Sequence, residues 1–407
     1  MKFLREWLDR SKPKFEKGGK LETFYALYEA QDTFLFTPGE VTKGPTHVRD
    51  ALDLKRMMVT VVLALLPCCL WAMYNTGLQA HQVIAAGHAL PIDNWQTAIF
   101  QWVGLSFDPT SVVACTVYGA LYFLPVLAMC FLVGGNVEVI SAILRKHEIN
   151  EGFLVTGFLF PLVLPPTIPL WQVAIGIVFG VVIAKEVFGG TGMNVLNVAL
   201  VSRAFLFFAY PAQISGDRVW IAANMIDGHS GATLLAQTDF ATPALYTSDL
   251  WWNAFMGYVP GSMGETSTLC CLIGAAVLIA TQIGSWRTMA GVVAGTAALG
   301  LIFNAIGSAT NPAFQMPWYF HFVLGGWAFG AVFMATDPVT SSFTDKGKLI
   351  YGFGIGAMVV LIRTVNPAYP EGMMLAILFM NMFAPLIDYV FVKGNIKRRQ
   401  RRLAANA

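Results

Sequence analysis

The uncharged run MMVTVVLALLPCCLWAMYN, residues 57–75, sets the fold class of this chain. A helix needs about 20 apolar residues to cross the hydrocarbon core of a bilayer, and this run is close to that length. The whole chain of 407 residues is 56% hydrophobic and 12% charged, whereas soluble domains carry roughly 25% charged residues. The sequence therefore predicts an all-α polytopic membrane protein.

Similar apolar runs recur along the chain and predict about ten transmembrane helices. The third run is short and ends in Pro165-Pro166-Thr167-Ile168-Pro169, so we expect a broken or half-crossing helix there. The predicted spans are residues 57–75, 112–133, 153–167, 170–187, 194–210, 266–284, 288–306, 318–335, 349–364 and 372–392.

The distribution of Lys and Arg predicts the orientation in the membrane. With a cytoplasmic N-terminus, all of the 26 Lys and Arg residues except Arg203, Arg218 and Arg363 fall in cytoplasmic segments or at the cytoplasmic ends of spans. Such a bias is what the positive-inside rule requires. We therefore expect both termini in the cytoplasm and the long central connection on the other side.

Five segments follow from this pattern. A cytoplasmic, amphipathic N-terminal segment precedes two membrane halves of about five helices each. This segment fits a membrane surface, the surface of partner subunits, or a role in contacting a ligand. Because five is odd, the second half starts on the opposite face, so we expect two halves related by inverted symmetry, with broken helices. The boundaries are 1–56 for the N-terminal segment, 57–210 and 266–392 for the halves, 211–265 for the connection, and 393–407 for a basic tail.

A short pattern, G-x-x-F-G-x-V, occurs at residues 176–182 and again at 326–332. The two copies fall on the fourth and eighth spans, which run in the same direction, so an inverted repeat does not account for them. Small-residue patterns recur by chance on packed membrane helices.

The central connection contains Asp227-Gly228-His229-Ser230-Gly231-Ala232-Thr233. Its residues are small or hydrogen-bonding, and the final hydroxyl follows Gly and Ala, which leaves room for a bulky group. We interpret it as a covalent attachment site for a flavin phosphate; the alternative is a Gly-containing turn between spans.

The fourth span runs into a glycine-rich stretch, Lys185 to Asn197, that can turn tightly at membrane depth. Asn194 and Asn197 lie three residues apart, hence on one face of a helix, and offer amide donors and acceptors to a flavin ring. Helix capping and interhelical hydrogen bonding are the alternatives.

Other candidate residues lie at the cytoplasmic ends of spans. Gly134 and Gly135, followed by Glu138, allow close approach of a flat ring or simply of another helix. Asp337 and Asp388 are carboxylates suited to a hard cation such as sodium, or to capping and pairing with Lys346 or Lys393.

The six cysteines, at positions 68, 69, 115, 130, 270 and 271, fall in apolar runs without a CxxC motif. This spacing indicates small buried side chains and predicts no iron–sulfur or zinc site.

Together these motifs resemble the B subunit of the bacterial sodium-translocating NADH:quinone oxidoreductases. The likeness covers nearly the whole chain and includes Met-Ala-Thr-Asp-Pro-Val-Thr-Ser at 334–341. It implies FMN bound through a phosphoester to Thr233, within the motif of Asp227, Ser230, Gly231 and Ala232. It further implies riboflavin at Asn194 and Asn197, ubiquinone near Gly134, Gly135, Glu138 and Phe153, and a sodium path through Asp337 and Asp388.

The resemblance also implies a place in the cell and a set of partners. The chain would be a redox-driven sodium translocase subunit of the bacterial inner membrane with its FMN loop in the periplasm. It would be matured by a flavin transferase and assembled with an NADH-oxidising flavoprotein and iron–sulfur subunit, a second subunit with covalent FMN, and small membrane subunits. Two alternatives are the D subunit of the related ferredoxin:NAD complex, which lacks a long N-terminal extension, and a secondary ion transporter without redox cofactors.

Overall fold

The chain forms a bundle of helices in the computed structural model, which describes residues 2–16, 18–36, 54–145, 149, 152–237, 245–308, 310–366 and 369–406. Within these residues the only strands are β1 (Ala89–Leu90) and β2 (Asn224–Met225), which pair antiparallel. Six helical stretches are long and apolar enough to cross a membrane. The predicted all-α polytopic class is therefore confirmed.

The long stretches cover six of the ten predicted spans. The first is far longer than the apolar run alone indicated, because the helix continues beyond Asn75 through polar residues to Ala85. The six are α3 (Leu54–Ala85), α5 (Val112–Arg145), α7 with its continuation (Leu170–Phe188), α12 (Trp286–Ile306), α14 (Asp345–Val365) and α15 (Met373–Asn406).

The other four predicted spans are short or interrupted. Three contain one short apolar helix each: α6 (Gly152–Leu162), α8 (Val198–Ala209) and α11 (Thr268–Ala280). The predicted span 318–335 is three short pieces, η8 (Trp318–Phe322), α13 (Trp327–Phe329) and η9 (Gly330–Met334). The interrupted segments α6 and η8–η9 lie in the third predicted span of each half.

Both interruptions leave backbone carbonyls that must find donors, because lipid offers none. At the end of α6, the backbone N–H groups of Met263 and Gly264 donate to the carbonyls of Leu164 and Leu162 over 3.1 and 2.8 Å. At η8, the buried guanidinium of Arg363 donates to two carbonyl groups at 2.9 and 2.8 Å, those of His321 and Leu324. Each break is thus stabilised by groups from elsewhere in the bundle.

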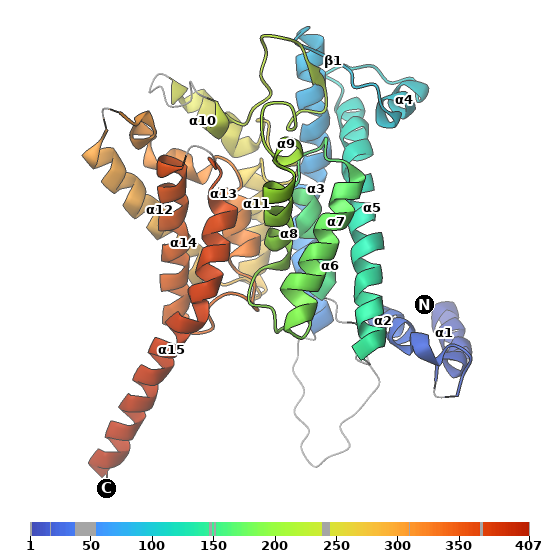
Figure 1. The fold of residues 1–407 in the computed structure, drawn as a ribbon, viewed down its shortest axis with the longest axis vertical. Coiled ribbons are helices and arrows are strands. Elements are labelled where there is room, and N and C mark those ends of the chain that lie inside the picture. The colour runs from blue at the N-terminus through green and yellow to red at the C-terminus, as the bar shows by residue number, and fades with distance from the viewer. Residues whose placement is uncertain are drawn as a thin grey trace.

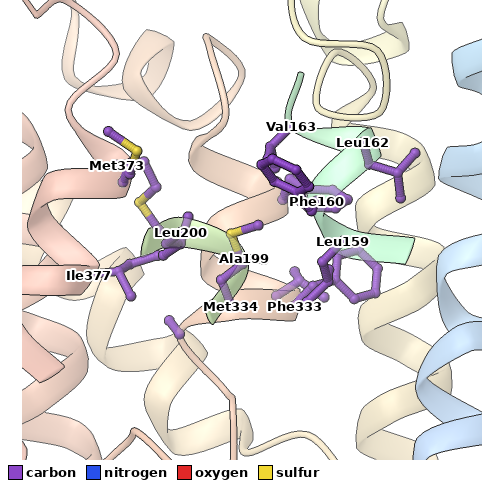
Figure 2. Packing of buried hydrophobic residues seen from close by; sticks show 14 of the residues in the cluster. Leu159, Phe160, Leu162, Val163, Ala199, Leu200, Phe333, Met334, Met373 and Ile377 are labelled. Atoms are coloured by element: carbon purple, nitrogen blue, oxygen red, sulfur yellow. The ribbon is translucent and has the colours of Figure 1, made fainter. Parts of the chain in front are cut away.

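The core lies where the short segments of the two halves meet. Figure 2 shows side chains of α6 and α8 facing side chains of η9 and α15, among them Phe160, Leu200, Phe333 and Ile377. Phe160 and Ile377 are fully buried. Dispersion contacts of this kind, with interhelical hydrogen bonds, hold helices together in a membrane.

The repeated G-x-x-F-G-x-V pattern has a structural counterpart. In each copy the second glycine begins a π-helix, η2 (Gly180–Lys185) in the first half and η9 in the second. A side chain on Gly180 would overlap Ser202 of α8, and one on Gly330 would come within 2.5 Å of Met373 of α15. Each π-helix therefore packs closely on the last helix of its own half, which explains the glycines of a pattern that the sequence left without a role.

The remaining elements lie at the two ends of the bundle (Figure 1). The N-terminal helices and the C-terminal end of α15 share one end, while β1, α4 and α10 lie at the other. Residues 37–53, part of the predicted N-terminal segment, fall outside the residues that the structure describes. These end elements are α1 (Lys2–Phe15), η1 (Glu22–Phe24), α2 (Tyr25–Leu35), α4 (Trp95–Trp102), α9 (Pro211–Ile214), η4 (Leu234–Ala236), α10 (Ser248–Met256) and η7 (Pro312–Gln315).

Candidate functional site

A cavity lies between the two halves, and we call it the inner cavity. Its volume is about 790 Å³, which includes space open to solvent at its mouth. Its apolar wall includes three residues of α3 and two of α6, together with Val198, Leu278 and Phe333. The polar residues that line it are Thr156, Lys185, Thr191, Asn194, Asn197, Thr336 and Asp337.

Asn194 and Asn197 both line the inner cavity, but they do not lie on a helix as the three-residue spacing led us to expect. The backbone is non-helical from Gly192 to Asn197, and α8 begins only at Val198. Three glycines with positive φ, at positions 189, 190 and 192, make the turn that precedes it. The helical-face prediction was therefore wrong in its geometry, although the turn brings both amides to one cavity.

Asn197 joins the two halves of the bundle. Its side-chain oxygen accepts a hydrogen bond from Leu200 N and so caps α8, while Nδ2 donates to Asp337 Oδ2 at 3.2 Å. Asp337 also accepts from Val339 N and Thr340 Oγ1 at 3.1 and 3.0 Å. The candidate flavin-binding amide and the candidate sodium carboxylate are therefore direct neighbours.

A further polar contact that sequence reasoning missed lies behind this pair. The buried amide of Asn381, oriented so that every group has a partner, accepts from Asn197 N at 3.2 Å and donates to the Tyr351 hydroxyl at 2.5 Å. The sequence could have indicated this contact, because each residue is a polar residue inside an apolar run. Asn381 falls in the predicted span 372–392 and Tyr351 in the predicted span 349–364.

The candidate quinone residues also come together. Gly134 faces the ring of Phe153, so closely that a side chain at this position would overlap the ring, whereas one at Gly135 would meet no atom within 4 Å. One turn further along α5, the buried carboxylate of Glu138 pairs with the buried ammonium of Lys185. Lys185 in turn lines the inner cavity, so this ion pair connects the two candidate regions.

A second, smaller cavity, which we call the outer cavity, lies beside Thr233. It has a volume of about 390 Å³ with its mouth, and its wall includes Ser262, Glu265, Gly325 and Glu371. Thr233 is only 6% exposed, although Asp227 to Ser230 of the same motif are exposed. The hydroxyl that the sequence placed on an open loop therefore belongs to the wall of a cavity.

The structure anchors the motif that carries Thr233 at both ends. Before it, β2 pairs with β1 at the end of α3, and the ring of His229 stacks on that of His88 with centroids 3.9 Å apart. Within it, Gly231 N donates to Asp217 O at 3.0 Å, and a side chain on Gly231 would come within 2.8 Å of that oxygen. Gly231 is thus required by close approach of the backbone.

Asp388 lies apart from the inner cavity and has a full set of protein donors. Its carboxylate accepts from Ser342 Oγ, Phe343 N, Thr344 N and Thr344 Oγ1, at 2.6 to 2.9 Å. These bonds hold the turn that begins α14. The alternative of pairing with Lys393 does not occur, because that ammonium lies over the ring of Tyr389.

The fold and these two cavities define the class as a polytopic helical membrane protein with a polar cavity between two halves. The sequence model described as the NQR2, RnfD, RnfE family matches residues 41–397, and the chain belongs to this family. The prediction from the sequence motifs is confirmed at this level.

Curated relatives place the chain within the family. It is 58% identical over 403 residues to the B subunit of the Na(+)-translocating NADH-quinone reductase of Chromohalobacter salexigens, with 99% of this chain and 97% of that relative covered. The B subunits of the same reductase from Klebsiella pneumoniae strain 342 and Pseudomonas aeruginosa strain LESB58 are 56% and 57% identical, over 98% of this chain and 99% of each relative. The expected membership in an oxidoreductase complex is confirmed by these relatives, whose names carry the subunit designation.

Proposed function

We propose that this chain is the membrane subunit of a sodium-pumping NADH:ubiquinone oxidoreductase that carries electrons between two flavin sites and couples their transfer to sodium export. The observation that carries the proposal is the Asn197–Asp337 hydrogen bond in the inner cavity, which joins the amide that we assign to the flavin and the carboxylate that we assign to the cation. The names of the relatives support the same reaction.

The inner cavity suits riboflavin. It offers apolar walls for the ring system, amides for the ring carbonyls and nitrogens, and one polar atom still without a partner among the described residues, the buried Thr191 Oγ1. Asn194 and Asn197 would hold the ring. When bound, a flavin supplies reversible uptake of electrons, while the residues around it supply position and electrostatics.

Thr233 would carry FMN through a phosphoester bond, and the transferase that forms this bond would read the exposed part of the motif around Ser230. The supporting observation is that Thr233 borders a cavity whose wall also includes Val259 to Ser262, the residues shortly after α10. Glu265, whose carboxylate would otherwise repel a phosphate, lies 3.8 Å from the guanidinium of Arg203. The local charge at this part of the wall is thereby balanced.

Ubiquinone would bind near Gly134, Gly135, Glu138 and Phe153, at the end of the bundle that holds both termini. The open space over Gly135 supports this placement, because a flat ring needs a surface without side chains. Sodium would pass near Asp337. Asp388 would act on that path through the turn that begins α14 rather than as a free ligand, since its donors already occupy both oxygens.

The same proposal implies a cellular location and a set of partners. The chain would lie in the bacterial inner membrane with both termini in the cytoplasm and the Thr233 cavity on the periplasmic side, as the distribution of Lys and Arg favours. Its partners would be the NADH-oxidising subunit, a second FMN-carrying subunit and small membrane subunits. The ferredoxin:NAD paralogue is disfavoured, because the full-length relatives at 56–58% identity are named as B subunits of the quinone reductase. A secondary transporter without flavins is the remaining rival.

The test is mass spectrometry of the tryptic peptide spanning Val219–Arg287 from complex matured in its native host. The added mass of an esterified FMN is expected, and in-gel flavin fluorescence of this subunit should vanish in Thr233→Ala. Thr266→Ala, which removes another hydroxyl from the same cavity, is the matched control and should keep the fluorescence. An unmodified peptide with a colourless complex would leave the secondary transporter as the better reading.

A further inference from the structure

Lys185 is a buried cation in an unusual position. It ends the π-helix η2, is 4% exposed, and pairs with Glu138 of α5, which is 6% exposed. Burying two charges at membrane depth carries a large desolvation cost. An ion pair of this kind therefore calls for a reason beyond joining two helices.

A second ion pair joins α5 to the residue that directly follows η2. Glu186, the next residue after Lys185, pairs with Arg145 of α5 at 3.6 Å. Arg145 lies two helical turns from Glu138 on the same face of α5, and its side chain is 42% exposed. The Arg145–Glu186 pair thus fastens α5 to η3 (Glu186–Phe188). Although the Glu186 side chain is only 8% exposed, neither residue of this pair lines the inner cavity.

What distinguishes Lys185 is its place in the wall of the inner cavity. Among the described residues that line this cavity it is the single cation, and the single carboxylate among them is Asp337, which accepts three hydrogen bonds. A ligand that gains negative charge in this cavity therefore meets one positive group, and that group is held in place by Glu138.

We propose that the Lys185 ammonium stabilises the negative charge gained on reduction by the ring bound in the inner cavity, and that Glu138 positions this ammonium and limits its effect. The inference rests on the proposed function, which places riboflavin there. Addition of two electrons, delivered from NADH through the partner subunits, and one proton from water to a neutral isoalloxazine ring leaves one net negative charge. A fixed cation favours that charge, and the carboxylate paired with the cation opposes it.

The experiment measures the midpoint potential of riboflavin in the purified complex, by redox titration of its visible absorbance, together with the extracted riboflavin content. Lys185→Met should lower the potential, by about 30 mV or more if the reduced form is weakened tenfold relative to the oxidised form in a two-electron couple. Glu138→Gln should raise it. Lys185→Arg should restore most of the wild-type value, and Asp345→Asn, which breaks the exposed ion pair with Arg287, should leave it unchanged.

The opposite signs separate an electrostatic role from a merely structural one, because breaking a structural ion pair from either side has the same consequence. The double variant Lys185→Met with Glu138→Gln leaves no unpaired charge, so it serves if the single Lys185 variant fails to assemble. Its potential should lie below that of Glu138→Gln alone. Retained riboflavin with unchanged potentials, or with shifts of the same sign, would overturn the role of Lys185 but leave the proposed function intact. A wild-type complex without riboflavin would overturn the proposed function itself.

Discussion

The side-chain amide of Asn197 donates to the carboxylate of Asp337 at 3.2 Å, across 140 residues of chain. The first residue belongs to the turn before α8 in the first half, and the second follows η9 in the second half. The amide is one of three donors to that carboxylate. A ligand that accepts the hydrogen bond of the Asn197 amide would take this donor from Asp337, and so change the affinity of Asp337 for a cation. Binding at the two groups is therefore linked, and by thermodynamic reciprocity the link acts in both directions.

Replacing Asn197 should remove riboflavin from the complex. Asn197→Leu eliminates both the cavity amide and the helix cap, and loss of the cap alone costs about 1 kcal/mol. Asn197→Ser retains a capping hydroxyl but not the amide, so it controls for the loss of the cap. Both variants should show several-fold less riboflavin on extraction and chromatography, with FMN unchanged. Riboflavin at wild-type levels in both would remove Asn197 from the flavin site.

Alanine at Gly135 should raise the KM for ubiquinone several-fold without disturbing the fold. A methyl group there meets no protein atom within 4 Å, so an effect on KM reports contact with the quinone itself. Gly134→Ala is less informative, because its methyl group would displace the ring of Phe153. Gly394→Ala, equally free of neighbours near the end of α15, is the matched control for steady-state kinetics. Equal KM values for Gly135→Ala and Gly394→Ala would exclude quinone contact at Gly135.

Removal of the Asp388 carboxylate should loosen the start of α14. Asp388→Ala leaves four donors at the Ser342–Thr344 turn without their acceptor, which should cost at least about 2 kcal/mol and lower the melting temperature of the complex. We expect sodium stimulation of quinone reduction to weaken in the same variant. Asp388→Asn keeps one acceptor oxygen, so it should retain part of the melting temperature and part of the sodium stimulation. An unaltered sodium dependence in a destabilised Asp388→Ala complex would take this residue off the sodium path.

Arg363 should be essential to the stability of the fold, although it does not line the inner cavity. Its guanidinium donates to the carbonyls of His321, Leu324 and Glu371 at 2.8 to 3.0 Å. Arg363→Met therefore removes the donor from the buried carbonyls of His321 and Leu324, while the Glu371 carbonyl keeps a hydrogen bond from Met373 N. A loss on the order of 3 kcal/mol or more is expected, read as a lower melting temperature in detergent. Arg218→Met removes an exposed cation and should have little effect. Equal melting temperatures for the two variants would contradict this role.

The kind of segment could be predicted well, because a bilayer demands long apolar runs and such runs are visible in the chain. Six predicted spans are long apolar helices, whereas the other four are short or interrupted. Their lengths were harder to predict. The first helix extends to Ala85 because packing, not hydropathy, continues it, and the span 318–335 is broken because Arg363 supplies donors that local sequence does not reveal. The burial of Thr233 was likewise hidden, since residues far along the chain form the outer cavity.

The sequence by itself determined that the chain is a bundle of membrane helices in two blocks, and which motifs could hold a flavin, a quinone or a cation. Short apolar runs and small-residue motifs act locally, so they can be recognised in one dimension. Only the tertiary structure decided that Asn197 contacts Asp337 and that Lys185 pairs with Glu138. It also decided that Asn197, Asp337 and Lys185 line the same cavity. Buried polar groups must find partners, and in a membrane those partners come from whichever helix the packing brings near.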